Sequence, residues 1–218
     1  MDELAKVLSG NRTKIAEIYL KAKKAVVEKG FSAEIDWQSK IRFPNITEAD
    51  FLREAAWVVL SSGMRESVIC LKFPAISAAF YYWQSANHVV KNSETCRRHA
   101  LPIFCHRQKI NAIIKIAEQI TAQGFKIFKN RIRNKGIDFI KTLPFMGPAT
   151  SYHLAKNIGL DVVKPDRHLV RVAAATGYNS PRLLCEEIAK IVGDRLSVID
   201  LVIWRFATLN SNYLEYFS

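Results

Sequence analysis

The chain has 218 residues, of which 49% are hydrophobic, and its 32 basic and 20 acidic side chains give a formal net charge of +12. This composition excludes a disordered tail, and the length is enough for one sizeable domain or two small lobes. The positive charge predicts a polyanionic partner, most often nucleic acid, with an anionic membrane surface or an acidic protein as the alternatives.

The start of the chain carries acid where a secretory signal carries base, and no apolar run is long enough to cross a bilayer. We therefore expect a soluble intracellular protein with no membrane partner. The four cysteines are scattered, which favours reduced thiols over a disulfide framework. The group Cys96, His99, Cys105 and His106 matches no standard zinc spacing, so we expect no metal site.

Apolar residues recur at helical spacing along the chain, and no convincing period-two strand pattern is present. The first helix is expected to end at Gly30, and the segment from Trp37 to Asn45 is irregular. Thr47 and Asp50 then predict a capping box. Further helices are predicted over 52–60, 66–71, from Pro74 through 83, and over 110–124, 125–135, 137–143, 148–158, 166–176, 181–192 and 197–209. The predicted fold class is all-α.

A tight turn separates the helices predicted over 137–143 and 148–158. Pro144 fixes its own φ, Gly147 permits a positive φ, and Pro148 opens the next helix at a position where no N–H is needed. Backbone N–H groups at such a helix start can hold a phosphate whatever the base sequence. An ordinary helical hairpin is the alternative interpretation.

Asp166 lies nineteen positions after Gly147 and directly follows Pro165. Proline keeps its predecessor extended, so Asp166 is predicted to cap the helix that begins there. A cap alone would account for an acidic residue at this position.

Taken together, residues 143–147 and the set Asp166, His168, Leu169 and Arg171 resemble the helix-hairpin-helix DNA glycosylase superfamily, which includes endonuclease III and the alkylation-base glycosylases. The family signature is Leu-Pro-Gly-x-Gly in the hairpin, followed by Asp-x-His, an aliphatic residue, any residue and Arg. A weaker resemblance extends over roughly residues 48–206. It implies a bilobal fold, with a helical barrel over 46–160 that ends in the hairpin, and a second lobe formed by 1–45 and 161–218. The cleft between the lobes would carry the catalytic Asp166.

Two departures from the family pattern affect the expected chemistry. Phe145 replaces the first hairpin glycine, which predicts a differently shaped turn and a weaker grip on phosphate. Ala149 stands where bifunctional members carry a nucleophilic lysine, so the resemblance implies a monofunctional enzyme that uses water. The alternatives are a bifunctional glycosylase/lyase with a displaced lysine and a non-catalytic helix-hairpin-helix DNA-binding protein. The iron–sulfur cysteines of endonuclease III have no counterpart, and we expect no cofactor, a monovalent cation at the hairpin excepted.

The resemblance assigns Asp166 to catalysis, where a fixed carboxylate stabilises positive charge that develops on the deoxyribose. The expected partner of a monomeric protein is double-stranded DNA with a damaged or mismatched base. An alkylated purine is favoured over adenine, uracil or oxidised guanine, because its base is already a cationic leaving group.

Base extrusion from the duplex requires a side chain that fills the gap, and Met64 or Arg65 is predicted to do so, with a plain surface turn as the alternative. The extruded base needs an aromatic face, for which the candidates are Tyr81, Tyr82 and Trp83. DNA contacts are expected from the hairpin and from the basic helix before it: Gly147, Ala149, Lys129, Arg131 and Arg133. A solvated helix face is the alternative for the basic residues.

Overall fold

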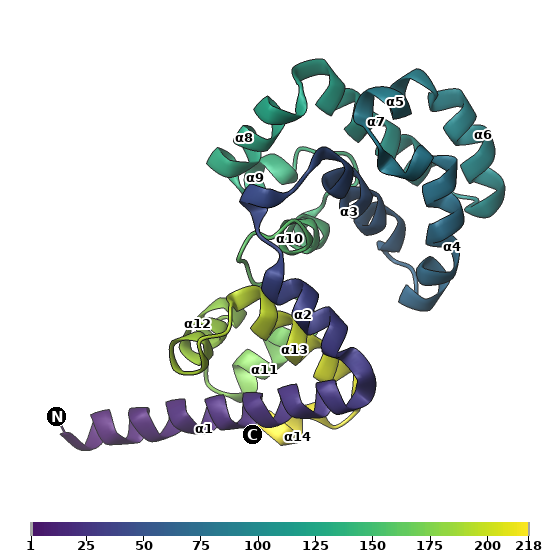
Figure 1. Cartoon of the computed structure of the whole chain (residues 1–218). Helices are drawn as coiled ribbons and strands as arrows, with labels where there is room; N and C mark the ends of the chain where they lie inside the picture. Colours follow the sequence, from purple (N-terminus) through teal and green to yellow (C-terminus); the bar gives the residue numbers. More distant parts are fainter. Residues whose placement is uncertain (1, 218) are drawn as a thin grey trace. The chain divides into compact units, whose positions relative to one another are not determined.

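The computed structural model describes the backbone of residues 2–217 and the side chains of residues 13–217, and within that range every regular element is a helix (Figure 1). The predicted all-α class is therefore confirmed. The chain divides into two compact units: unit 1 comprises Met1–Ile41 and Gly159–Ser218, and unit 2 comprises Arg42–Ile158. The lobe boundaries expected at 46 and 160 lie within four residues of these divisions.

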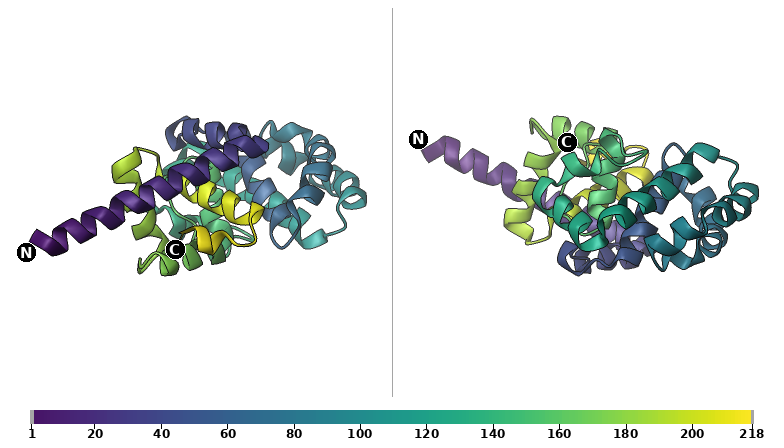
Figure 2. Two further views of the ribbon diagram at one scale, coloured as in Figure 1. Left: turned by 90° about the horizontal axis from the view of Figure 1, so that it is seen from below. Right: turned by 90° about the horizontal axis from the view of Figure 1, so that it is seen from above.

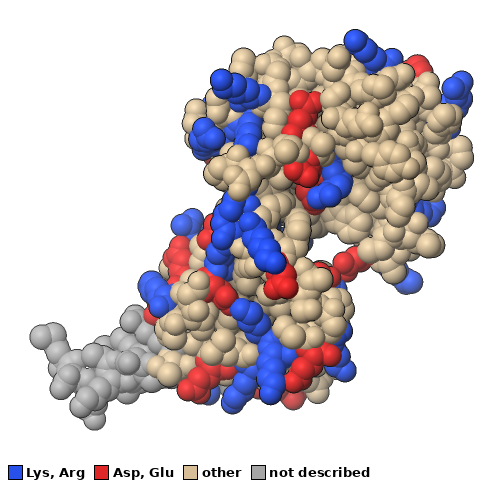
Figure 3. All heavy atoms as spheres, in the orientation of Figure 1, with Lys and Arg blue, Asp and Glu red and all other residues tan. Residues whose placement is uncertain are grey.

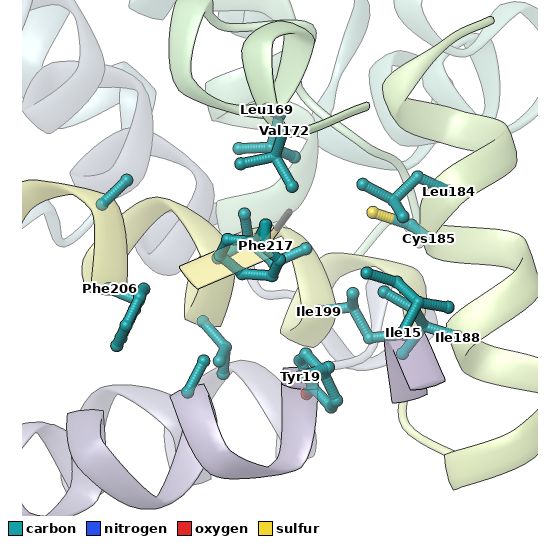
Figure 4. Packing of buried hydrophobic residues seen from close by; sticks show 14 of the residues in the cluster. Ile15, Tyr19, Leu169, Val172, Leu184, Cys185, Ile188, Ile199, Phe206 and Phe217 are labelled. Carbon is teal, nitrogen blue, oxygen red and sulfur yellow. The ribbon is translucent and has the colours of Figure 1, made fainter. Parts of the chain in front are cut away.

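Unit 1 is built around α13, whose apolar residues form its central packing face. Buried side chains follow one another at helical spacing along α13, and α1, α2, α11, α12 and α14 all contact this helix. Figure 2 shows α1 as one long helix, and Figure 4 shows its Ile15 and Tyr19 meeting the core residues of α12 and α13. The elements are α1 (Asp2–Val26), η1 (Val27–Phe31), α2 (Ser32–Lys40), α11 (Arg167–Ala175), α12 (Pro181–Val192), α13 (Leu196–Leu209) and α14 (Tyr213–Phe217).

Unit 2 is built around α3, which is buried along most of its length and contacts α4, α5, α7 and α10. The predicted capping box is present, because Thr47 and Asp50 each accept a hydrogen bond from the other's backbone N–H. The elements are η2 (Phe43–Asn45), α3 (Glu48–Ser61), α4 (Glu66–Ala79), η3 (Tyr81–Trp83), α5 (Ala86–Lys91), α6 (Ser93–Ile103), α7 (Arg107–Gln123), α8 (Phe125–Lys135), α9 (Ile137–Ile140) and α10 (Pro148–Asn157).

The structure corrects the sequence interpretation at several helix boundaries. The segment from Trp37, expected to be irregular, continues α2 as far as Lys40. Pro74 does not start a new helix but lies inside α4, where the carbonyl that it leaves without a donor belongs to the exposed residue Cys70. Helix α4 then ends before residues 81–83, which form a turn. Helices α5 and α6 were not predicted, since each buries only two side chains.

No helix among the described residues combines the length and the apolar character needed to span a membrane.

Candidate functional site

The hairpin turn between α9 and α10 holds one residue, Phe145, in a backbone conformation that favours glycine. Phe145 adopts a φ of 64°, which costs a residue with a side chain about 1–2 kcal/mol. Buried Leu143 and Met146 on either side secure the turn, and the Met146 N–H donates to the Leu143 carbonyl at 3.1 Å. Gly147 itself is extended, at φ −77° and ψ −173°. The positive φ that we attributed to Gly147 therefore belongs to Phe145.

The start of α10 is open to solvent and has no side-chain cap. Gly147, Pro148 and Ala149 are exposed, and no described residue accepts a hydrogen bond from the N–H of Gly147 or Ala149. A Cβ added to Gly147 would meet only Thr150 Oγ1, at 3.9 Å. Packing within the chain therefore leaves this position free for a larger residue, and the bare backbone is accessible to an external group. Open N–H groups at a helix start favour an anion.

The basic helix α8 packs against the hairpin within unit 2. Helix α8 carries five cationic residues and no acidic one, and it contacts α9. The Arg131 guanidinium lies 5.1 Å from the centre of the Phe139 ring on α9 and donates to Gln123 Oε1 at 3.1 Å. On the face drawn in Figure 3, Lys and Arg side chains gather over α8. Arg131 also lines a pocket of about 630 Å³ among α7, α8 and α9.

Lys129 differs from its neighbours on α8, because its ammonium group is used inside unit 2. Its Nζ donates to the carbonyls of Pro44 and Ile46, each at 2.8 Å, and lies 5.8 Å from the centre of the Phe43 ring. Burial lowers the pKa of Lys129, and Arg133 lowers it further. Arg131 and Arg133 are exposed, so they are the members of the predicted set whose charge faces solvent.

The segment predicted to enter the duplex is an exposed turn between α3 and α4. Gly63 has a φ of 68°, Met64 is 42% exposed, and Arg65 is exposed as well. Buried Lys109 on α7 fixes the preceding end of α3, because its Nζ donates to the carbonyls of Leu60, at 2.8 Å, and Ser62. Burial lowers the pKa of Lys109. No local pattern in the sequence identifies Lys109 as an anchor, because the carbonyls that it binds lie more than 40 positions earlier in the chain.

The hairpin and this turn meet the same end of α7. The rings of Phe145 and His106 lie nearly perpendicular to each other, with the two ring centres 6.1 Å apart. His106 caps α7 by accepting a hydrogen bond from the Lys109 N–H at 3.4 Å. Since Lys109 also holds the end of α3, the first turn of α7 brings together two segments that the sequence placed more than 70 residues apart.

The three aromatic candidates differ in exposure, and Tyr82 is the most exposed of them. Trp83 is 2% exposed and stacks on Phe80 at 4.9 Å, so its ring belongs to the core of unit 2. Tyr81 lies edge-on to His88 at 4.5 Å, whereas Tyr82 is 69% exposed. All three candidates have φ between 52° and 64°, so this strained turn projects Tyr82 outward.

Asp166 caps α11 in unit 1, as predicted. Its Oδ1 accepts hydrogen bonds from the N–H groups of His168, at 2.9 Å, and Leu169, at 3.0 Å. No residue whose side chain is described donates to Oδ2, and the side chain is partly exposed. One carboxylate oxygen therefore fixes the orientation, while the other is available to a molecule outside the chain.

His168 lies beside this carboxylate. Burial lowers the pKa of His168, and the negative charge of Asp166 opposes that shift. Its Nδ1 is buried without a partner among the described residues, and its ring lies 5.3 Å from that of Tyr213. His168 therefore packs within unit 1 through its contact with Tyr213.

A buried carboxylate that the sequence analysis missed joins α10 to α3. Glu54 is 8% exposed, and its Oε2 accepts a hydrogen bond from Asn157 Nδ2 at 3.0 Å. Burial raises the pKa of Glu54 despite the opposing charge of Arg53. The signal was visible in the sequence, because Glu54 shares the apolar face of α3 with Phe51 and Val58.

Three positions near the hairpin bear on whether a lysine outside the family's usual position could act as a nucleophile. Ala149 occupies the expected lysine position and is exposed. Lys141 pairs with Asp138 at 3.5 Å, and Lys156 is only 6% exposed. In the described part of the chain, no cluster of three or more His, Cys, Asp or Glu side chains is arranged to hold a metal ion.

Comparisons of the chain with protein-family models, with curated proteins and with solved structures found no match. Functional inference therefore rests on the residues and contacts described above.

Proposed function

We propose that this protein is a DNA glycosylase that takes a damaged base out of duplex DNA and hydrolyses its N-glycosidic bond. The observation that carries the proposal is the carboxylate of Asp166, which two backbone N–H groups hold through Oδ1 while Oδ2 receives no hydrogen bond from any described side chain. A cap needs only one oxygen. The second oxygen is free to stabilise a developing positive charge or to orient water.

The binding residues are proposed from unit 2. The open start of α10 holds one phosphate, and Arg131 and Arg133 extend the contact along the strand. Met64 or Arg65 fills the gap that base extrusion leaves. Tyr82 offers the aromatic face on which an unpaired base stacks.

The reaction breaks the bond between C1′ of the sugar and the base nitrogen, and the base leaves with the electron pair. Positive charge develops on the sugar, where Asp166 stabilises it, and a water oxygen then forms the new bond to C1′ and loses a proton to solvent. An alkylated purine needs no proton donor to leave because it is already cationic. Such a substrate suits this site, for which we propose an ionised carboxylate but no general acid to protonate the leaving base.

The decisive experiment replaces Asp166 by Asn and measures single-turnover excision. Asn caps a helix about as well as Asp, so the fold should remain, while excision should fall by about 100- to 1,000-fold. Duplex affinity should hold or rise slightly, since a negative charge near phosphate is lost. As the matched control, Ser180→Ala removes the cap of α12 and should leave excision unchanged. Excision by Asp166→Asn at the parental rate would show that Asp166 is not the catalytic carboxylate, whereas a parental chain that excises no base would return the protein to the non-catalytic binding class.

A panel of duplexes that carry alkylated purine, mismatched adenine, uracil or oxidised guanine identifies the base. Borohydride trapping on the same duplexes separates the monofunctional enzyme from the lyase alternative, because only a lysine nucleophile forms a Schiff base. Ala149 in the lysine position predicts no trapped adduct. A trapped adduct would assign the chemistry to a displaced lysine.

A further inference from the structure

The segment that leads to Asp166 has little structure of its own. Between α10 and α11 the described backbone forms no helix from Leu160 to Asp166, and its internal hydrogen bonds join the N–H of Val162 to the carbonyl of Leu160 and that of Asp166 to the carbonyl of Lys164. Pro165 has no N–H to contribute. The position of Asp166 therefore depends on contacts between this segment and its surroundings.

Two carboxylates tie this segment to the first turns of α13. At one end Asp161 Oδ1 accepts a hydrogen bond from the N–H of Ser197 at 2.9 Å. At the other end Asp200, which is 1% exposed, accepts a short hydrogen bond at Oδ2 from the N–H of Lys164. The segment contributes one acid and the helix contributes the other, so both ends of the segment are fastened to the same helix.

We propose that Asp200 is a positioning residue for Asp166, an inference that rests on the proposed function. Lys164 lies two residues before Asp166, and Pro165 between them fixes its own φ, so a movement at Lys164 is passed on to the carboxylate. A buried carboxylate is unfavourable unless it is well hydrogen-bonded, and an ionised acceptor holds an N–H more strongly than a neutral one. Asp200 lies among the apolar core residues of α13, and its hydrogen bond to the Lys164 N–H accounts for an acid at this buried position.

The test uses Asp200→Asn in the full chain and two independent measurements. Single-turnover excision should fall by about 10- to 100-fold, the scale that a displacement of about 1 Å produces, while duplex Kd should change less than about twofold. Amide hydrogen exchange at His168 and Leu169 should accelerate, because these N–H groups are protected by Asp166 Oδ1. The exchange readout does not depend on activity.

Glu34→Gln is the matched control, since it weakens a different carboxylate contact to the same helix, the ion pair of Glu34 with Arg205 at 2.7 Å. This variant should lower the melting temperature and leave both excision and exchange at those two amides at parental values. Parental exchange in Asp200→Asn overturns the proposal, whatever happens to excision. A parental chain that excises no base in the panel would contradict the proposed function, while the exchange result would still decide the role of Asp200.

Should Asp200→Asn not fold, Asp161→Asn loosens the more exposed end of the same segment and is measured in the same way. A smaller acceleration of exchange at His168 and Leu169 supports the proposal. Unchanged exchange there overturns it.

Discussion

Helices α10 and α11 begin with the same chemistry and use it in opposite ways. Each starts from an extended residue, Gly147 at φ −77° and ψ −173° and Asp166 at φ −86° and ψ 169°. The first N–H groups of α11 are bound by the Asp166 carboxylate, whereas the start of α10 has no side-chain cap. A helix start carries partial positive charge in both cases.

The difference separates two tasks that a nucleic-acid enzyme requires. A helix start that is satisfied from within can hold a carboxylate in one orientation, which suits stabilisation of a charge that appears only during reaction. A helix start that is left open attracts an anion from outside, which suits attachment to a phosphate. The glycine at 147 and the aspartate at 166 account for the difference, since their backbone conformations are nearly the same.

The largest expected effect concerns Arg131 and Arg133, the exposed cations on α8 that we propose to extend the phosphate contact made at the start of α10. Changing Arg131 and Arg133 together to Gln should make the slope of log Kd against log salt shallower by about 1.8, because each phosphate contact contributes about 0.9. Duplex binding measured by fluorescence anisotropy over a range of salt concentrations gives this slope. An unchanged slope would place the DNA surface elsewhere on the protein.

Lys129→Gln is the control for that experiment, because it removes a charge from the same helix. Its ammonium group bonds to the carbonyls of Pro44 and Ile46, so the variant should lower the melting temperature of the protein. The salt slope should stay at its parental value. A slope that falls in Lys129→Gln by about half as much as in the double variant would show that net charge alone, and not the exposed position of the arginines, sets the affinity.

Prediction of structure from the sequence succeeded where a local rule determines the structure. The cap at Asp166 and the end of α8 at Gly136 each follow from short-range preferences of one or two residues. It failed at Pro74, where the position of the carbonyl on the exposed side of α4 permits a proline inside the helix. The clamp from Lys109 to the end of α3 joins residues 47 and 49 positions apart, and no local pattern reports such a contact.

Lys129 shows the same limit within the candidate site. In the sequence it is one of five cations on a helix without acid, and nothing distinguishes it from Arg131 or Arg133. The two carbonyls that it binds belong to Pro44 in η2 and to Ile46 just after it, more than 80 residues earlier in the chain. Residue type predicted a basic surface, but tertiary contacts decide which charges remain available to a partner.

A smaller effect is expected when α10 is made to resemble α11. Gly147→Asp should cap α10, because the backbone at 147 already has the conformation of the Asp166 cap. Stability should rise by about 0.3 kcal/mol, while duplex affinity should fall about tenfold, which corresponds to about 1.4 kcal/mol. The carboxylate takes the N–H groups and places negative charge where the phosphate would bind.

Gly147→Ser separates the two causes, since serine caps a helix without adding charge. It should stabilise the fold to a similar degree and weaken duplex binding less than Asp does. Chemical denaturation and anisotropy titration on the same three proteins provide the comparison. Parental DNA affinity in Gly147→Asp would mean that no phosphate binds at the start of α10.

The smallest expected effect concerns His168, whose imidazole reports the charge on Asp166. Burial lowers the pKa of His168 below its ordinary 6.5, and Asp166 holds it up. Between the folded-state pKa and 6.5 the unfolded chain binds a proton that the folded chain does not, so stability rises with pH through that window and falls on acidification. Asp166→Asn removes the negative charge that opposes the lowering of the His168 pKa. The pKa of His168 should therefore fall further in this variant, and the pH range over which stability rises should extend to lower pH. NMR titration of the imidazole Cε1–H in both proteins measures the two values directly, with Glu34→Gln as a control that should leave them unchanged. A His168 that titrates above 6.5 in the parental chain, or identically in Asp166→Asn, would show that its environment is set by something other than burial beside an ionised Asp166. The titration thereby tests the ionisation of the catalytic candidate without depending on any substrate.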